Sequence, residues 1–289
     1  MGEASRVTGR FRGTFDVLHS LTYFAPETDA ALTDAGLRPG RMTYFAGRAA
    51  PMGAVSPGVV AATFYNFNPE LVARYIYIPR AWTLASPDRI IEARFEAVDA
   101  TLTRLLGKDT IDSEEVAEAA ELAREATGGC QVDGRPLYAG HADLDWPSEP
   151  HLVLWHAITL LREHRGDGHI AALVLNGLGG LDALVTHTAT GKGFQAAAAK
   201  ASRGWSDEQW DAAADALRER GVLDAEGGLT EAGNDLRERI EAATNAASTG
   251  PWEHLGEEKT KRLHELCGPL SRQAVEAGAF PANVFSTGR

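Results

Sequence analysis

The sequence predicts a mainly α protein: a helical N-terminal domain plus a winged-helix-like C-terminal domain with a short two-stranded wing. Helix-start signals and apolar residues at helical spacing recur along the chain and favour helices throughout. Residues 204–248 follow the order of a winged helix: helix, short strand, glycine tip, short strand and long helix. Strand signals are confined to residues 221–224 and 228–230, so the wing should be small.

The expected helices of the first half begin at capping residues. Apolar side chains near helical spacing predict a helix over residues 10–24. Asn68 and Ser86 each precede a proline, which is the preferred arrangement at a helix start, so each should cap a helix. The helix that follows Ser86 should run on until Gly107 stops it.

The second half carries similar signals. Ser206 and Gln209 have the spacing of a capping box, which predicts a helix directly after Ser206. Thr230 should cap the last long helix of the winged-helix block. A further helix is expected over residues 257–278, where leucines at helical spacing could pack back onto the body of the protein.

Shifts in composition predict the domain boundaries. A stretch rich in glycine, proline and aspartate lacks periodicity and reads as a linker. The predicted units are residues 1–128 as a helical domain with aromatic-rich segments, residues 129–150 as a linker, residues 151–248 as the winged-helix-like domain, and residues 249–289 as a C-terminal helix and tail.

Composition indicates a soluble globular protein. The chain has 289 residues, of which 44% are hydrophobic and 24% are charged, enough to form two packed domains. Its two cysteines, Cys130 and Cys267, form no disulfide framework or metal motif, so we expect a cytoplasmic location. No apolar run is long enough to span a membrane, and no membrane partner is expected.

Charge argues against nucleic acid as a partner. The formal net charge is −12, and residues 204–248 hold four arginines, no lysines and eleven acidic residues. DNA affinity depends largely on Lys and Arg side chains that neutralise phosphates. The predicted recognition helix is acidic, so nucleic-acid binding is expected to be absent although the pattern is that of a winged helix. Whether the chain forms a homodimer is left open.

The first candidate site is a polar corner in residues 151–169, which hold four of the nine histidines. His156 lies in an apolar segment and should be buried and hydrogen-bonded, with Arg162 or Asp167 as its neighbour. Asp167 is placed to cap a second helix that begins after this one ends. A structural polar corner is the alternative interpretation. The candidate residues are His156, His164 and His169 for catalysis, and Arg162, Arg165 and Asp167 for ligand binding.

The second candidate site is aromatic and lies in the N-terminal domain. Three short aromatic stretches punctuated by a few polar groups are typical of a pocket for a small organic ligand, although an aromatic core would look the same. Arg48 is the natural anchor for an anionic group. We expect this site to face the histidine corner across the domain interface. The candidate ligand-binding residues here are Tyr23, Tyr44, Arg48, Tyr65 and Asn66.

No cofactor can be assigned from the sequence. Nucleophile elbows, phosphate-binding loops and the HExxH zinc motif do not occur. The spacing of His164 and His169 is not a standard metal spacing, so no metal ligands are assigned. A haem or metal site that uses His156, His164, His169 or His187 is kept as an alternative, and it rests on histidine content alone.

Four strings carry a family resemblance: YFAGRAAPMG (44–53), FYNFNP (64–69), LVLWHAITLLREHRGDGHIAALVLNGL (152–178), and the block around Ser206 that ends in LTEAG (229–233). Together they resemble an actinobacterial helix-turn-helix family of unknown function. The last block is also similar to the MarR-type winged helix, which implies a recognition helix, a wing and a following helix. The acidic segment 224–228 departs from the long, arginine-bearing MarR-type wing.

The sequence supports three functional hypotheses. The first is a protein that binds a small organic, anionic ligand, with an enzyme of specialised metabolism as one form of it, and uses the acidic winged helix as a scaffold. The second is a ligand-responsive MarR-like transcriptional regulator. The third is the haem or metal protein. Charge favours the first over the second, since fold alone is a poor guide to function.

Overall fold

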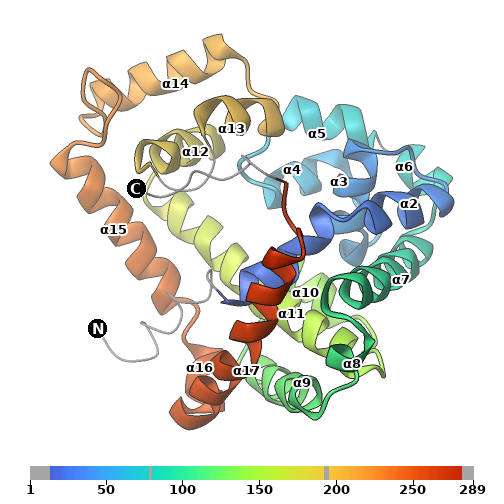
Figure 1. Cartoon of the computed structure of the whole chain (residues 1–289). Helices are drawn as coiled ribbons and strands as arrows, with labels where there is room; N and C mark the ends of the chain where they lie inside the picture. The colour runs from blue at the N-terminus through green and yellow to red at the C-terminus, as the bar shows by residue number, and fades with distance from the viewer. Residues whose placement is uncertain (1–13, 78–79, 192–194, 282–289) are drawn as a thin grey trace.

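The computed structural model describes residues 14–77, 80–191 and 195–281, and its regular structure in these ranges is helical (Figure 1). Residues 14–20 are helical as well. The α-helices are α2 (Pro26–Asp34), α3 (Arg41–Ala49), α4 (Pro57–Thr63), α5 (Pro69–Ile76), α6 (Arg80–Leu84), α7 (Pro87–Leu106), α8 (Lys108–Ile111), α9 (Glu114–Thr127), α10 (Pro136–Ala142), α11 (Pro150–Leu175), α12 (Gly180–Ala189), α13 (Ala196–Arg203), α14 (Asp207–Glu219), α15 (Glu231–Ala246), α16 (Gly250–Leu255) and α17 (Glu257–Glu276). Two short 3₁₀ helices are η1 (Leu21–Tyr23) and η2 (Ala50–Met52).

The expectation of a mainly α fold is confirmed, but the two-stranded wing is wrong. Between α14 and α15 the described chain forms only an isolated antiparallel bridge, Leu223 with Leu229. The turn at 224–228 and the cap residue Thr230 take up most of the connection, so each side is left shorter than the three residues that a strand normally needs. The tip closes instead through the Asp224 carboxylate, which accepts a hydrogen bond from the Gly228 amide at 2.7 Å.

The capping predictions are confirmed by the hydrogen bonds. The Ser86 hydroxyl accepts from the Arg89 amide, and α7 ends at Gly107 as expected. Ser206 and Gln209 form the reciprocal capping box at the start of α14, and Thr230 caps α15. These helix starts could be read from sequence because each depends on one side chain and an amide two or three residues away.

The break expected near residue 165 is wrong, because α11 runs without interruption from Pro150 to Leu175. Asp167 lies inside this helix and does not cap a second one. Its carboxylate instead accepts hydrogen bonds from the Leu137 and Tyr138 amides, both at 3.0 Å, at the start of α10. Gly166 and Gly168 remain helical because neighbouring elements pack on α11, which overrides the low helix propensity of glycine.

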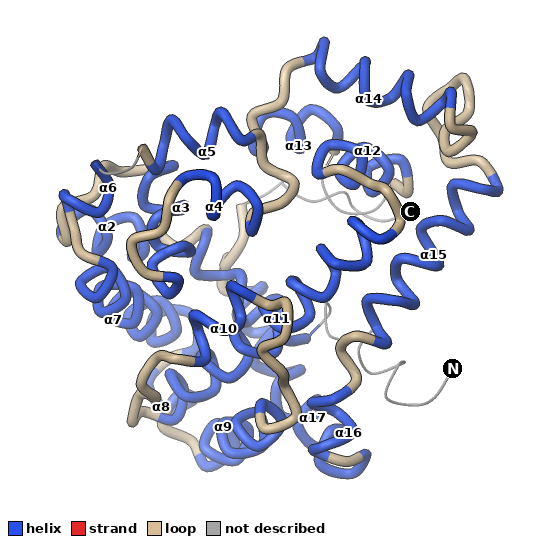
Figure 2. The backbone as a smooth tube through the Cα atoms, turned by 180° about the vertical axis from the view of Figure 1, so that it is seen from behind, coloured by secondary structure: helices blue, strands red, loops and turns tan. Residues whose placement is uncertain are grey.

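Helix α11 is the centre of the packing (Figures 1 and 2). It packs on α7, α9, α10 and α15. Three hydrophobic clusters result. One joins α7, α9, α11 and α17, where Leu263 of α17 is fully buried; a second joins α2 to α5 with α7; the third joins the end of α11 to α12, α14 and α15. The tail leucines therefore dock on the body as predicted.

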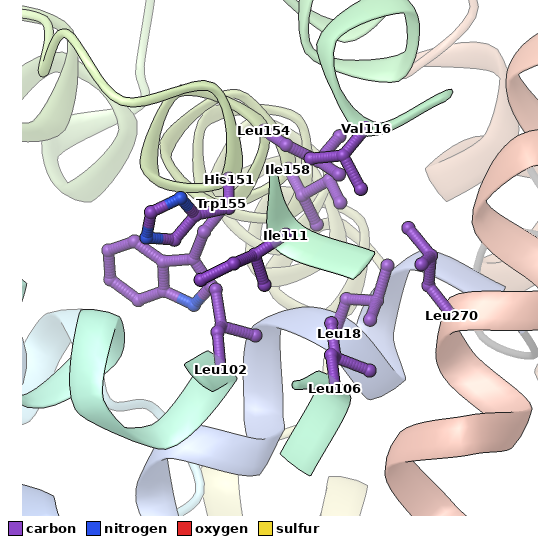
Figure 3. A pocket seen from close by; sticks show the side chains of 10 residues that line it. All are labelled: Leu18, Leu102, Leu106, Ile111, Val116, His151, Leu154, Trp155, Ile158 and Leu270. Carbon is purple, nitrogen blue, oxygen red and sulfur yellow. The ribbon is translucent and has the colours of Figure 1, made fainter. Parts of the chain in front are cut away.

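The first cluster encloses a small apolar cavity of about 20 Å³ (Figure 3). Leucine, isoleucine and valine side chains converge on it, and the rings of His151 and Trp155 lie at one end. This volume holds one water molecule at most, so the cavity is a packing defect and cannot take an organic ligand.

None of the helices in the described ranges is by itself both long enough and apolar enough to cross a membrane. The bent pair α11 and α12 passes the length and composition test only when taken together across a 98° break.

We predict that Gly140→Ala destabilises the protein. A Cβ at Gly140 in α10 would lie 2.6 Å from the Pro51 carbonyl oxygen of η2, so backbone has to move. Overpacking of this kind lowers the free energy of unfolding by about 1–3 kcal/mol. Chemical denaturation monitored by circular dichroism measures the loss. Gly58→Ala in α4 is the matched control, because its Cβ would meet its nearest neighbour at 3.9 Å; equal stability of the two variants would contradict the prediction.

Candidate functional site

A buried group of polar side chains lies where α3, α7 and α10 meet α11; we call it the polar cluster. It also takes residues from the segment 14–20 and from η1. Its members are His19, Tyr23, Tyr44, Arg48, Arg94, His141, Thr159, Arg162 and Glu163. Charged residues are rarely buried without a partner or a purpose, and this cluster contains three arginines.

Glu163 is the acceptor at the centre of the polar cluster. Its side chain is 3% exposed, and Arg162 Nη1 donates to both carboxylate oxygens, at 2.9 and 2.8 Å. Arg48 Nη2 lies 3.7 Å from Glu163 Oε1, and His19 Nε2 lies 3.8 Å from the same oxygen. The one carboxylate is therefore shared among two guanidinium groups and an imidazole.

Arg48 comes from the last turn of α3 and is surrounded by aromatic rings. Its guanidinium carbon lies 4.5 Å from the centroid of Phe64 and 5.1 Å from that of Tyr23. Nη1 donates a hydrogen bond to the Tyr44 hydroxyl at 2.8 Å. The Nε atom is buried and finds no acceptor among the described residues. Arg48 thus retains an unused donor at a position that is 9% exposed.

Arg94 on α7 also lies against an aromatic ring and also has a buried donor without an acceptor. Its guanidinium carbon lies 4.8 Å from the Trp155 ring centroid, and Nη1 meets His141 Nε2 at 3.4 Å. Within the described part of the chain, Nη2 has no acceptor and no carboxylate reaches ion-pair distance of Arg94. Burial lowers the pKa of this arginine, while the Tyr23 hydroxyl and Glu163 raise it.

Both arginines line one cavity of about 270 Å³, which we call the α2–α3 cavity. Liquid water occupies about 30 Å³ per molecule, so roughly nine waters would fill it. Thr28, whose buried Oγ1 also has no partner among the described residues, is another lining residue. The remaining lining residues are Thr22, Tyr23, Phe24, Ala25, Pro26, Asp29, Leu32, Gly40, Thr43, Tyr44 and Gly47.

The pKa values of the two tyrosines that line the cavity shift in opposite directions. Burial raises the pKa of Tyr23, and Arg48 and Arg94 offset only part of that increase. Burial acts in the same direction on Tyr44, but Arg48 and Arg203 outweigh it, and the pKa of Tyr44 falls below its usual value. The cavity therefore contains one hydroxyl that strongly retains its proton and one that releases it more easily.

The histidines of the polar cluster are neutral. Burial, followed by the field of Arg162, holds the pKa of His19 well below its usual range. Burial and then Arg94 do the same for the pKa of His141. The positive charge at the cavity thus comes from the guanidinium groups.

The structure brings together four of the predicted site residues. Tyr23, Tyr44, Arg48 and Arg162 all belong to the polar cluster, although they come from η1, α3 and α11. His156 lies outside it. Its ring packs edge-on to Trp146, with centroids 4.8 Å apart, is tilted against Phe95, and is 1% exposed. His156 does not line the α2–α3 cavity, yet the Arg94 charge acts on both.

The hydrogen bond expected for His156 is absent among the described residues, since neither ring nitrogen has a partner. The proposed neighbours are also wrong. Asp167 lies eleven residues further along α11, about 16 Å away along the helix axis, and Arg162 projects from a different side of the helix.

His164, Arg165, Asp167 and His169 form a separate corner that joins α11 to α10 and α15. Arg165 Nη2 contacts the Glu241 carboxylate at 2.6 Å, and His169 Nδ1 meets Thr244 Oγ1 at 2.8 Å. Burial raises the pKa of Asp167 to about 6, and burial followed by the nearby Arg135 lowers that of His164 to about 4.

Tyr65 and Asn66 lie at a third place. The Tyr65 hydroxyl donates to the Leu178 carbonyl at 2.7 Å, and the Asn66 carbonyl accepts from Trp205 Nε1 at 3.0 Å. Both contacts tie the α4–α5 connection to the C-terminal helices. These two residues, and the corner described above, do not line the α2–α3 cavity.

No group of three or more His, Cys, Asp or Glu side chains is placed to hold a metal ion in residues 14–77, 80–191 and 195–281. His187, the remaining haem candidate, ends α12 and is not a lining residue of the α2–α3 cavity.

Sequence reasoning did not assign His19, Arg94, His141 or Glu163 to the site. A signal was present for Arg94, which is spaced four residues from both Ile90 and Val98 on the buried stripe of α7. A charge on an apolar helix face must find a partner or serve a ligand. His19 shows the same pattern, because it follows the buried Phe15 by four residues.

We predict that His156 contributes to acid sensitivity. Burial, and then Arg94, lower its pKa to about 4, so the unfolded chain takes up a proton more readily than the folded one. The contribution of the neutral His156 ring to the free energy of unfolding is complete above about pH 6.5, the usual imidazole pKa. This contribution is lost as the pH falls toward 4. His156→Leu should remove on the order of 3 kcal/mol of the fall in unfolding free energy over this window.

Urea unfolding between pH 4 and pH 8 measures this slope. His254→Gln is the control, since that side chain is exposed and should leave the pH dependence as in the parent protein. A His156→Leu profile parallel to the parent profile would show that this imidazole does not titrate in the way described.

Comparison with known proteins gives one match. A model described as a helix-turn-helix family covers residues 8–281. No curated protein and no solved structure matches significantly. Because the family model spans nearly the whole chain, including the polar cluster and the α12–α15 block, the protein belongs to this helix-turn-helix family.

Proposed function

We propose that this protein binds a small anionic organic molecule in the α2–α3 cavity, and that the acidic α14–α15 region serves as a scaffold. One observation carries the proposal: Arg48 and Arg94 both line this cavity, both are buried, and each has a donor without an acceptor. A buried cation without a counter-charge opposes folding unless a ligand supplies that charge.

The excess of buried arginines over carboxylates supports an anion over a neutral ligand. Arg162 and Glu163 satisfy one another through two short hydrogen bonds. Arg48 only shares this carboxylate at 3.7 Å, and Arg94 has no carboxylate within reach in the described chain. A carboxylate or similar group in the cavity would supply counter-charge to the two guanidinium groups, which suit planar anions.

The rest of the lining suits a compact body with an apolar part. Tyr23 and Tyr44 pack edge to face, with centroids 5.5 Å apart, and Phe24 and Leu32 add apolar wall. Pockets for drug-sized ligands measure about 300–1,000 Å³, so this cavity fits a molecule at or below the lower end of that range. The location we propose is the cytoplasm, where the free thiols Cys130 and Cys267 would remain reduced.

A ligand-responsive transcriptional regulator is the second candidate, favoured by membership of a helix-turn-helix family. In this version α14 corresponds to the MarR-type recognition helix, as the resemblance implies. The acidic residues of α14 argue against it, because all of them are exposed: Asp207, Glu208, Asp211, Asp215 and Glu219.

We predict that benzoate, a probe with one carboxylate and one ring, binds the parent protein and that Arg94→Met weakens this binding. Methionine keeps an apolar stem over Trp155 but removes the charge. Calorimetric titration should show at least a tenfold weaker benzoate affinity. The melting temperature without ligand should stay the same or rise, because the variant no longer buries an unpaired charge.

Arg38→Met is the matched control, since Arg38 is exposed in the connection between α2 and α3. This variant should bind benzoate as the parent protein does. A strongly destabilised Arg94→Met protein combined with no benzoate binding by the parent would assign Arg94 a structural role and refute the proposal. Inorganic phosphate, titrated in parallel, tests whether the anion must be planar.

We predict no appreciable duplex DNA binding at physiological salt. Phosphates would approach the exposed acidic face of α14, which repels them. Fluorescence polarisation with a duplex taken from the region upstream of the coding sequence measures this. Tight binding that weakens steeply as salt is added would favour the regulator over the scaffold.

A further inference from the structure

The Tyr23 hydroxyl, which borders the α2–α3 cavity, is the first member of a buried hydrogen-bonded chain. It lies 2.7 Å from His19 Nε2, and His19 Nδ1 lies 3.0 Å from Thr159 Oγ1. His19 and Thr159 are both fully buried. A hydroxyl, an imidazole that can take its proton, and a third group that orients the imidazole are the parts of an activated acid–base site.

The hydrogen bonds fix the tautomer of His19. Thr159 has one hydroxyl proton, and it donates this proton to the Trp155 carbonyl at 2.8 Å. His19 Nδ1 must therefore carry the hydrogen and donate to Thr159 Oγ1. Because the imidazole is neutral, Nε2 then offers a lone pair, and the Tyr23 hydroxyl donates into it. The Tyr23 oxygen keeps its own lone pairs, and the guanidinium group of Arg94 lies beside it.

The His19 ring is held in this orientation. It stacks on the Trp155 indole with an interplanar angle of 5° and centroids 6.0 Å apart. Trp155 Nε1 also donates to the His19 carbonyl at 3.4 Å, so the backbone and the ring of His19 are both fixed against α11. A fixed imidazole reduces the reorganisation that a proton transfer requires.

Charges of both signs act on the transfer of a proton from Tyr23 to His19. The negative charge left at the tyrosine, or on a substrate that gives it a proton, would face the guanidinium groups of Arg48 and Arg94, which favour it. The same arginines and Arg162 oppose a positive charge on His19. The carboxylate of Glu163, 3.8 Å from His19 Nε2, is the group that would offset them.

We propose that Tyr23 is a catalytic general acid–base residue, with His19 as its relay, and that the protein catalyses proton transfer at a carbon next to a carbonyl of the bound anion. This inference rests on the proposed function, because the substrate is the anion held by Arg48 and Arg94. It goes further by assigning a reaction, an enolisation or isomerisation, to the same cavity.

The step balances without a co-reactant. The substrate C–H bond breaks, and its electron pair stays on the substrate as an enolate beside the guanidinium groups. The proton bonds to the Tyr23 oxygen while the original Tyr23 proton moves to His19 Nε2. Reversal of the relay returns a proton to the same atom or to another atom of the enolate. The first return exchanges hydrogen with solvent, and the second gives an isomer.

A purely structural polar cluster accounts for less of the geometry. Pairing His19 with Tyr23 and Thr159 satisfies those groups and needs nothing else. It leaves unexplained why the donors of Arg48 and Arg94 around the same cavity lack acceptors. A substrate carboxylate in the cavity would supply the missing counter-charge, and Tyr23 lines the same cavity.

Hydrogen–deuterium exchange tests this reaction with simple probes. Pyruvate, 2-oxobutyrate and phenylpyruvate are small carboxylates with a C–H next to a carbonyl. In D₂O, the parent protein should speed deuterium incorporation into at least one of them, followed by proton NMR, by about 100-fold or more over the same buffer. Tyr23→Phe should lose about 100-fold of that rate while its benzoate affinity stays within about threefold.

Tyr75→Phe is the matched control; its ring lies beside Arg41 and Arg74, away from the cavity lining, and it should exchange as the parent does. Saturating benzoate should block exchange by the parent, a test that needs no variant to fold. Uninhibited exchange, or a Tyr23→Phe rate equal to the parent rate, would overturn the inference. Benzoate binding without exchange of any of the three acids would also overturn it and leave the proposed function standing; absence of both would refute the two together.

Discussion

The need to neutralise one buried carboxylate organises this protein. Glu163 lies near the middle of α11, and its charge is compensated by Arg162 on the same helix and by Arg48 at the end of α3, while the neutral His19 ring lies beside it. These contacts bring α3 and the segment 14–20, two elements distant in sequence from α11, to one point on that helix. Removing Arg162 would take away both short hydrogen bonds of the carboxylate in a dry interior, where an unpaired ion is strongly destabilising. The hydrophobic clusters then pack around this arrangement.

The same arrangement supplies more positive charge than Glu163 can balance. A fold selected for stability alone would replace the Arg94 guanidinium by an apolar side chain, since buried ionic groups are often neutral or unfavourable for folding. Its retention beside a cavity fits the general observation that functional sites conserve locally unfavourable groups which the rest of the structure offsets. The aromatic rings around Arg48 and Arg94 offset part of the free-energy cost of desolvating both cations.

Local features of the fold could be predicted from the sequence, and contacts between distant residues could not. The caps at Ser86, Ser206 and Thr230 were predictable because they depend on a few adjacent residues. The wing was predicted wrongly because strand-like residues on both sides of a glycine tip do not reveal that the turn and the Thr230 cap use most of the connection. The predicted break in α11 was wrong because glycines such as Gly166 and Gly168 interrupt a helix only when packing does not support it. At the site, Arg48 with the tyrosines was recognisable by residue type, whereas His19 and Arg94 required knowledge of which helices touch α11.

Helix α10 has a start that its own sequence does not provide. Arg135 stands at its N-cap position but its side chain makes no capping hydrogen bond, and the acceptor for the Leu137 and Tyr138 amides comes from Asp167 on α11. A helix of seven residues is too short to persist alone in water. It follows that α10 gains its order only when α11 is in place, so the two helices belong to one cooperative unit of opening and closing. His141, which contacts Arg94, lies on α10, so this contact of a cavity-lining arginine depends on tertiary folding and not on any local segment.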